Sequence, residues 1–215
     1  MIQNSFLVSM RHNLAPLLLL AQTVVALCGA QESLPEVADT IPDAARSLQA
    51  WDVQTQANRA VFESNDAIAT ALVFVTHDCP IANYYSVEIR RIAATYEPKG
   101  IRFALVYPDP DSTVETIRQH LDEYGHDELT AYADPQQHIV RAVGATVTPE
   151  AAVVLKDGNL VYRGRIDDLY ADFGKRRRAP RHTELRDALS AISQSRDVPT
   201  RQTKAVGCYI PPLQK

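Results

Sequence analysis

The chain has 215 residues, of which 46% are hydrophobic and 22% charged, so it is long enough for one well-cored domain with appendages but short for two. Its formal net charge is −4 and its pI is near 5.9, which leaves no basic surplus to neutralise phosphates. Nucleic acid is therefore set aside as a partner.

The first thirty residues have the pattern of a secretory signal peptide. An apolar run from Leu14 to Leu27 follows Arg11 and precedes the small pair Gly29-Ala30. The run is shorter than the roughly 20 residues that span a bilayer. We therefore expect a cleaved signal over 1–30, export to the periplasm or another extracytoplasmic compartment, and no stable membrane span after cleavage. A retained anchor is the alternative.

After the predicted signal peptide, the sequence predicts a linker followed by a folded domain. Residues 31–48 hold prolines and acidic residues without periodicity and are predicted to be a linker to a domain over 49–195. Trp51–Thr55 and Ala60–Phe62 flank a polar turn and predict a small hairpin. Ala71–Thr76 is a continuous apolar, partly β-branched run, which is typical of a central strand buried on both faces.

A strand-helix-strand-helix order follows. Apolar side chains recur at spacings of four and three between Pro80 and Tyr96, which predicts a helix that ends at Pro98-Lys99-Gly100. Ile101–Val106 is predicted to be a second buried strand. Ser112-Thr113-Val114-Glu115 has the capping-box pattern that opens a further helix. Such an order implies parallel strands.

The last part of the domain predicts an antiparallel end to the sheet. Asp134-Pro135 is expected to start a short helix, because proline is tolerated at the first helical position. Ala151–Leu155 and Leu160–Arg163 are predicted strands joined through Asp157-Gly158, a strong hairpin signal.

A final amphipathic helix is predicted from Thr183 to about Ile192, and residues 196–215 form a polar tail. The basic run Lys175–Arg178 between the hairpin and this helix is either a solvated loop or a docking surface for a partner.

Cysteine usage favours a disulfide. Removal of residues 1–30 deletes Cys28 and leaves Cys79 and Cys208. In a compartment where thiols oxidise, an even number of cysteines favours pairing. In the chain-entropy model a bridge over so long a loop would stabilise the fold by about 5 kcal/mol. A permanent structural disulfide therefore remains one interpretation, beside a redox-active pair.

Cys79 stands between the predicted central strand and Pro80, the first residue of the next helix. It is the expected N-cap, so its sulfur faces unpaired N–H groups and the positive end of the helix dipole, which favours a thiolate. Thr76 ends the strand on the same edge, where its hydroxyl can hydrogen-bond the thiolate or a peroxide oxygen. His77 and Asp78 either tune the thiol or are solvated loop residues.

The motif order resembles the peroxiredoxin-like branch of the thioredoxin superfamily, the redoxin or alkyl hydroperoxide reductase and thiol-specific antioxidant type. The matching segments are Phe74-Val75-Thr76-His77-Asp78-Cys79-Pro80-Ile81-Ala82, Val147–Glu150, Gly158–Asp168 and Val206–Cys208. The resemblance implies a thioredoxin-like α/β fold with a central mixed sheet flanked by helices, and no cofactor. It also implies that Cys79 is the attacking thiol and that Thr76 assists it.

Further roles follow from the same resemblance. Thr148-Pro149 is where a thioredoxin fold carries a cis proline beside the active cysteine, and Arg165, with Arg163, is a candidate for the cation that peroxiredoxins hold near their thiolate. Ala82 replaces the second cysteine of a Cys-x-x-Cys pair, so Cys208, expected in a mobile tail, is the candidate resolving thiol. The implied substrate is a hydroperoxide or a disulfide, with peroxidase activity as the favoured expectation, and an external thiol reductant resets the pair.

The sequence departs from the peroxiredoxin pattern at Leu72, which replaces a proline that the family keeps before the threonine. A different class of function therefore stays open. This alternative is a binding module without catalytic activity. Cys79, Cys208 and His77 would bind a soft metal such as Cu(I) or Zn(II), which thiolates prefer, or the module would bind a partner protein.

Overall fold

The computed structural model describes residues 39–62 and 66–213 of the chain. They belong to a unit that spans Leu34–Lys215. The predicted signal peptide over 1–30 lies outside the described residues. Within the described part, we find no helix that is long and apolar enough to cross a membrane.

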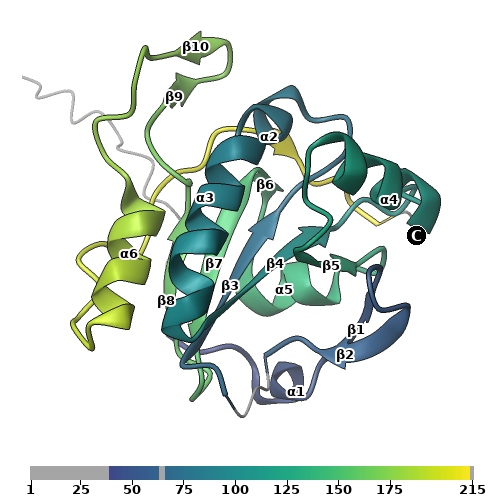
Figure 1. Cartoon of the computed structure of the whole chain (residues 1–215), viewed down its shortest axis with the longest axis horizontal. Helices are drawn as coiled ribbons and strands as arrows, with labels where there is room; N and C mark the ends of the chain where they lie inside the picture. The colour runs from purple at the N-terminus through teal and green to yellow at the C-terminus, as the bar shows by residue number, and fades with distance from the viewer. Residues whose placement is uncertain (1–38, 63–65, 214–215) are drawn as a thin grey trace, which may run out of the picture. The chain divides into compact units, whose positions relative to one another are not determined.

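A seven-stranded mixed sheet forms the centre of the unit, in the order β2-β1-β5-β4-β3-β7-β8 (Figure 1). The central strands β3, β4 and β5 are parallel, whereas β7 and β8 run antiparallel, as the hairpin signal predicted. The strands of this sheet are β1 (Gln49–Asp52), β2 (Ala57–Ala60), β3 (Ala69–Phe74), β4 (Ile101–Tyr107), β5 (Thr130–Ala133), β7 (Glu150–Leu155) and β8 (Leu160–Gly164).

Strand β3 is buried along its whole length, as its continuous apolar run predicted. Its side chains alternate between two cores: Ala71 and Val73 pack into one, and Leu72 and Phe74 into the other. Helices α3 (Ser86–Tyr96), α4 (Val114–Glu123) and α6 (Glu184–Ser193) contribute to the first core, and α5 (His138–Val143) contributes to the second. Helices therefore cover both faces of the sheet (Figure 1).

Two helix starts differ from the sequence expectation. The capping box of α4 uses Thr113 and Thr116, because the Ser112 hydroxyl instead donates to Asp109 Oδ2 at 3.1 Å. Helix α5 begins at His138, three residues beyond Pro135. The Asp134 carboxylate accepts hydrogen bonds from the backbone N–H groups of residues 138, 139 and 140 at 2.7 to 3.0 Å, so it caps this helix across an intervening turn.

The predicted helix after Pro80 is divided at Tyr85 into α2 (Pro80–Tyr84) and α3. The Tyr85 hydroxyl donates to the buried Asp167 Oδ1 at 2.5 Å. This hydrogen bond connects the junction of α2 and α3 to the segment that follows β8. The sequence does not predict strand β5, because its four residues of mixed polarity are too few to show the alternation that identifies a strand.

Residues 39–48, expected to be part of a linker, pack against the domain. They include the short helix α1 (Asp43–Arg46), and Ile41 is 1% exposed. The backbone N–H of Ile41 donates to Gly158 O at 3.0 Å. The folded unit thus begins before residue 49, and the predicted hairpin at its start is present as β1 and β2, shifted by two to three residues.

Two short strand pairs complete the fold around one end of the sheet. Strands β9 (Tyr170–Asp172) and β10 (Lys175–Arg176) form a hairpin that contains the start of the basic run. Strand β6 (Val147–Thr148) pairs antiparallel with β11 (Cys208–Tyr209) from the tail. The C-terminal tail is therefore part of the folded unit.

Candidate active site

Cys79 lies where the sequence predicts it, between the end of β3 and the first turn of α2. It is the N-cap residue of α2, with extended backbone angles, and Pro80 occupies the first helical position. The backbone fixes it on both sides: its N–H donates to Thr76 O at 3.3 Å, and its carbonyl accepts from Asn83 N at 2.9 Å. The residue is 1% exposed, so its sulfur is enclosed by neighbouring segments.

The first of these segments is the turn between β6 and β7. The Thr148–Pro149 peptide bond is cis. Cys79 Sγ lies 3.1 Å from Thr148 O, and the hydroxyls of Thr76 and Thr148 lie 3.2 Å apart. The Thr76 hydroxyl thus contacts the turn that holds Cys79, instead of the sulfur itself.

The second segment is the tail. Cys208 Sγ lies 2.7 Å from Cys79 Sγ, and both cysteines are free thiols. The register of β11 on β6 places Cys208 directly opposite Thr148. The two thiols that remain after the predicted signal cleavage, far apart in sequence, are therefore side by side.

The tail is held on both sides of Cys208, which corrects the expectation that it is mobile. Before the cysteine, Arg163 N donates to Arg201 O at 2.9 Å and Thr203 N donates to Arg163 O at 3.1 Å, so the tail follows β8. After it, Ile210 N donates to Thr146 O at 3.1 Å. The position of Cys208 is consequently set by backbone hydrogen bonds.

The protonation of Cys208 depends on its surroundings. Burial raises the pKa of the Cys208 thiol well above its ordinary value, and the hydrogen bond with Cys79 and the charges of Cys79 and Asp78 act in the same direction. Cys208 is therefore protonated at neutral pH.

Arg165 and Arg163, the candidate cations, are paired with carboxylates. Arg165 Nε donates to Glu184 Oε1 at 3.0 Å, a contact that raises the pKa of Arg165. Arg163 Nε lies 3.6 Å from Glu150 Oε1, and Arg163 Nη1 donates to Gly144 O at 2.7 Å. The structure thus brings Thr76, Cys79, Pro149 and Cys208 together, and it places Arg165 in an ion pair with α6.

Glu150 is a supporting residue that the sequence did not indicate. It is 4% exposed, and its Oε2 accepts from Thr146 N at 2.7 Å and from Val147 N at 3.3 Å. Burial raises the pKa of this carboxyl, while these N–H groups and Arg163 oppose the shift. Glu150 therefore anchors the turn that carries cis Pro149 and pairs with the tail.

A buried histidine, also missed, supports the loop before Cys79. His120 Nε2 lies 2.9 Å from Asn83 Oδ1, Asn83 Nδ2 donates to His77 O at 2.9 Å, and His120 Nδ1 lies 2.8 Å from the Tyr107 hydroxyl. Burial lowers the pKa of His120 to about 4, so the ring is neutral. Since Asn83 Oδ1 only accepts, Nε2 carries the proton and Nδ1 accepts from Tyr107. No local pattern marks such a chain of contacts in advance.

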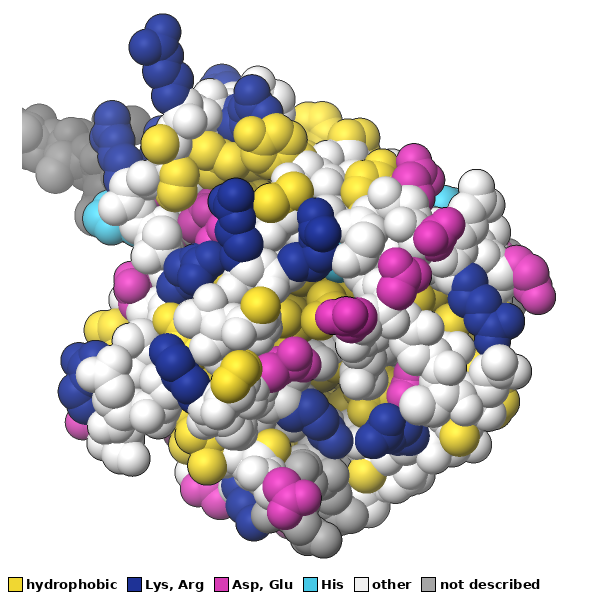
Figure 2. Space-filling model, viewed as in Figure 1, with side chains coloured by type: hydrophobic (Ala, Val, Ile, Leu, Met, Phe, Trp, Pro, Cys, Tyr) yellow, Lys and Arg dark blue, Asp and Glu magenta, His cyan; other side chains and the backbone are white. Residues whose placement is uncertain are grey.

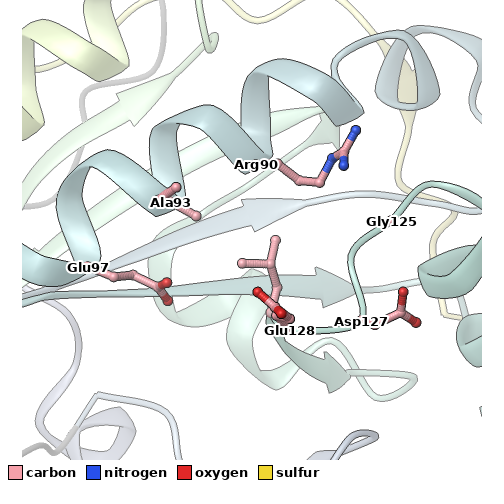
Figure 3. A pocket seen from close by; sticks show the side chains of 8 residues that line it. Arg90, Ala93, Glu97, Gly125, Asp127 and Glu128 are labelled. Carbon is pink, nitrogen blue, oxygen red and sulfur yellow. The ribbon is translucent and has the colours of Figure 1, made fainter.

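Two cavities near 500 Å³ differ in their relation to the cysteines. One of about 490 Å³ lies between α3 and the loop before β5; Arg90, Glu97 and Glu128 line it, and none of the predicted site residues does (Figure 3). The other, of about 520 Å³, is lined in part by Cys208. Within the described residues, no three His, Cys, Asp or Glu side chains are grouped to hold a metal ion.

The fold, with two free thiols side by side at a cis proline, is that of the thioredoxin superfamily. The chain belongs to the Redoxin family, whose model matches residues 36–172. The resemblance inferred from the motifs is confirmed at this level, and so is the thioredoxin-like fold.

Solved structures agree with the fold. An uncharacterized conserved protein from Geobacillus kaustophilus is 24% identical, with 85% of this chain and 99% of that chain covered and a TM-score of 0.68. A hypothetical protein from Sinorhizobium meliloti is 23% identical, with 83% and 95% covered and a TM-score of 0.69. DsbF of MTB, solved in mixed oxidized and reduced forms, is 18% identical, with 73% and 98% covered and a TM-score of 0.52. No curated protein matches the chain.

Proposed function

We propose that this protein is an exported thiol–disulfide oxidoreductase in which Cys79 attacks a substrate disulfide and Cys208 resolves the intermediate. The observation that carries the proposal is the 2.7 Å separation of the two sulfurs beside the cis Thr148–Pro149 bond. Two thiols in contact, one at a helix start and one on a strand paired to the same turn, are arranged to exchange a disulfide.

The reaction has two exchange steps. The Cys79 thiolate attacks one sulfur of the substrate disulfide; that S–S bond breaks, and the other substrate sulfur leaves as a thiolate and takes up a proton. Cys208 then loses its proton and attacks Cys79 Sγ. The second substrate thiol is released, so that the substrate gains two electrons and the protein holds a Cys79–Cys208 disulfide.

The shifted pKa of Cys208 supports this order of events. Part of the shift comes from the charge of Cys79 and from its hydrogen bond. Once Cys79 is in a mixed disulfide it carries no charge, so this part is lost and the Cys208 pKa falls toward the range set by burial. Cys208 becomes a better nucleophile when a mixed disulfide is present for it to resolve.

Hydroperoxide reduction is the second candidate. The Thr76-x-x-Cys79 spacing and membership of the Redoxin family favour it. In that reaction Cys79 becomes a sulfenic acid, and Cys208 attacks it with loss of water. The pairing of Arg163 with Glu150 and of Arg165 with Glu184 removes the two cations that would hold a peroxide, so we rank disulfide exchange first.

Substitution of each cysteine tests the proposal. Cys79→Ser is expected to abolish reduction of a model disulfide such as cystine, because serine cannot form the mixed disulfide. The same assay with hydrogen peroxide compares the second-order rates of the two candidate substrates. Cystine turnover that survives Cys79→Ser would contradict the assignment. If oxidised protein resists glutathione and never cycles, the Cys79–Cys208 bond is structural.

Export is part of the proposal and rests on the N-terminal sequence. The apolar run after Arg11 supports a signal peptide over 1–30, and a redox role for two remaining cysteines suits an extracytoplasmic compartment. N-terminal sequencing of the protein recovered from that compartment is expected to start after Ala30. Recovery of the full-length chain in the membrane fraction would favour a retained anchor instead.

A further inference from the structure

The two cysteines differ in their access to solvent. Cys79 is 1% exposed, whereas Cys208 is half-buried and lines the cavity of about 520 Å³. A molecule that enters this cavity therefore meets the sulfur of Cys208 and not that of Cys79. The backbone on both sides of Cys208 is fixed to β8 and to Thr146. We therefore expect the sulfur of Cys208 to stay on the cavity side when the Cys79–Cys208 disulfide forms.

The cavity lies between the tail and the β9–β10 hairpin, and its wall is largely apolar. Val147, Phe173, Val206 and Tyr209 contribute apolar surface. Phe173 is 70% exposed and Tyr209 is 86% exposed, unusually high values for aromatic side chains. Exposed aromatic side chains grouped beside a reactive sulfur are typical of a contact surface.

The rim of the cavity carries a positive surplus. Lys204 lines it, and the one acidic side chain of the lining, Asp172, is already paired with Lys175 Nζ at 3.5 Å. Arg176 adds a further cation on the hairpin, where its guanidinium lies 4.5 Å above the Tyr84 ring. Figure 2 shows Lys and Arg side chains around hydrophobic surface at the end of the molecule formed by α2 and the β9–β10 hairpin.

We propose that this cavity is the docking site of the external dithiol reductant, and that the reductant attacks Cys208 instead of Cys79. The occupant is a protein that presents an exposed dithiol next to apolar side chains and acidic residues. The apolar wall and the lysines of the rim complement that surface, and Cys208 supplies the sulfur that reacts. The inference rests on the proposed function, because it needs a Cys79–Cys208 disulfide to reduce.

The step balances as a disulfide exchange. The first reductant thiolate bonds to Cys208 Sγ, the Cys79–Cys208 bond breaks, and its electron pair leaves on Cys79 as a thiolate. The second thiol of the reductant, after loss of its proton, attacks the reductant sulfur bound to Cys208. Cys208 leaves and is protonated, and the reductant departs as a disulfide.

The test uses the full mature chain and 4-mercaptophenylacetate, a thiol that is aromatic and anionic. Wild-type protein is first oxidised with cystine, and the Cys79–Cys208 bond is verified by peptide mass spectrometry. Failure at this stage counts against the proposed function. The oxidised protein is then mixed with the probe, quenched by alkylation and mapped. An adduct on Cys208 with Cys79 alkylated supports the inference, and an adduct on Cys79 overturns it.

Rate constants test the docking surface itself. Phe173→Ala is expected to slow reduction by the probe at least threefold, and Val87→Ala, at an exposed apolar residue outside the cavity lining, is the matched control with no change. Lys204→Glu is expected to slow the anionic probe and to accelerate cysteamine, a cationic thiol. Equal rates for the wild type, Phe173→Ala and Lys204→Glu would overturn the inference even if the adduct is on Cys208.

Discussion

At the residue scale, the two thiols of the site differ in their exposure to solvent: Cys79 is buried, and Cys208 is more accessible. Cys79 is enclosed by the cis-proline turn and the tail, and Cys208 has a raised pKa with burial as its largest cause. The sequence could indicate Cys79, because a cysteine between a buried strand and a Pro-initiated helix is a local pattern. It could not show that Arg165 pairs with Glu184, because that contact joins two separate elements.

The titration of Cys208 gives a first prediction. Cys79→Ala removes the hydrogen bond and the charge that raise the Cys208 pKa but leaves most of its burial. We therefore expect the pH at which Cys208 reacts half-maximally with iodoacetamide to fall in the variant, measured as alkylation rate against pH. A midpoint that is unchanged or higher would contradict the coupling between the two thiols.

His120 gives a second prediction, for stability against pH. Its pKa is lowered from 6.5 to about 4 by burial, so as pH falls the unfolded chain takes up the proton first. The stability that the neutral ring contributes is present above pH 6.5 and is lost progressively toward pH 4. The loss is on the order of 3 kcal/mol for a shift of this size.

Buried carboxyls with raised pKa values, such as Glu150 and Asp134, act in the opposite direction, so the measurement must be a difference. Urea unfolding of the wild type and of His120→Gln between pH 7 and 4.5 isolates the histidine. The wild type is expected to lose more stability than the variant over this range. Parallel losses in the two proteins would show that His120 does not titrate as its burial indicates.

At the element scale, the β6–β11 pair positions Cys208. Gly207 precedes the strand, and a Cβ atom at this position would overlap Thr148 O, a backbone atom that cannot easily move. Gly207→Ala is therefore expected to push β11 away from β6 and to slow formation of the Cys79–Cys208 disulfide at least tenfold, with little change in the unfolding free energy of the sheet.

Timed alkylation after addition of cystine measures this rate. Val87→Ala is the matched control, because this side chain is 48% exposed and lies in α3, outside the β6–β11 pair. The control is expected to form the disulfide at the wild-type rate. A wild-type rate in Gly207→Ala would mean that the strand pairing does not bring the thiols together.

At the scale of the whole molecule, the elements that the sequence predicted are those with strong local signals. The apolar run of β3 and the Asp157-Gly158 turn identified the central strand and the antiparallel end of the sheet. Contacts between distant segments cannot be predicted from local sequence patterns. Neither the packing of Ile41 against the domain nor the path of the tail along β8 produces a periodic pattern in the sequence.

The same distinction applies to the site. The sequence motifs place Thr76, Cys79 and Pro149 on neighbouring segments of one fold. The resemblance to the family implied that these three residues lie close together. Cys208 was assigned by elimination, since Ala82 removes the local partner. Its fixed position is a finding of the structure, because backbone hydrogen bonds on both sides of it involve residues tens of positions away.

The most direct test of the account is a trapping experiment with Cys208→Ser and cystine, followed by peptide mass spectrometry. The variant is expected to accumulate a mixed disulfide on Cys79 with one cysteine per chain, because no thiol is left to resolve it. The wild type is expected to release two cysteines and to hold a Cys79–Cys208 disulfide. A variant that forms no adduct, or a wild type that keeps both thiols free, would contradict the assignment of Cys79 as attacking thiol and Cys208 as resolving thiol.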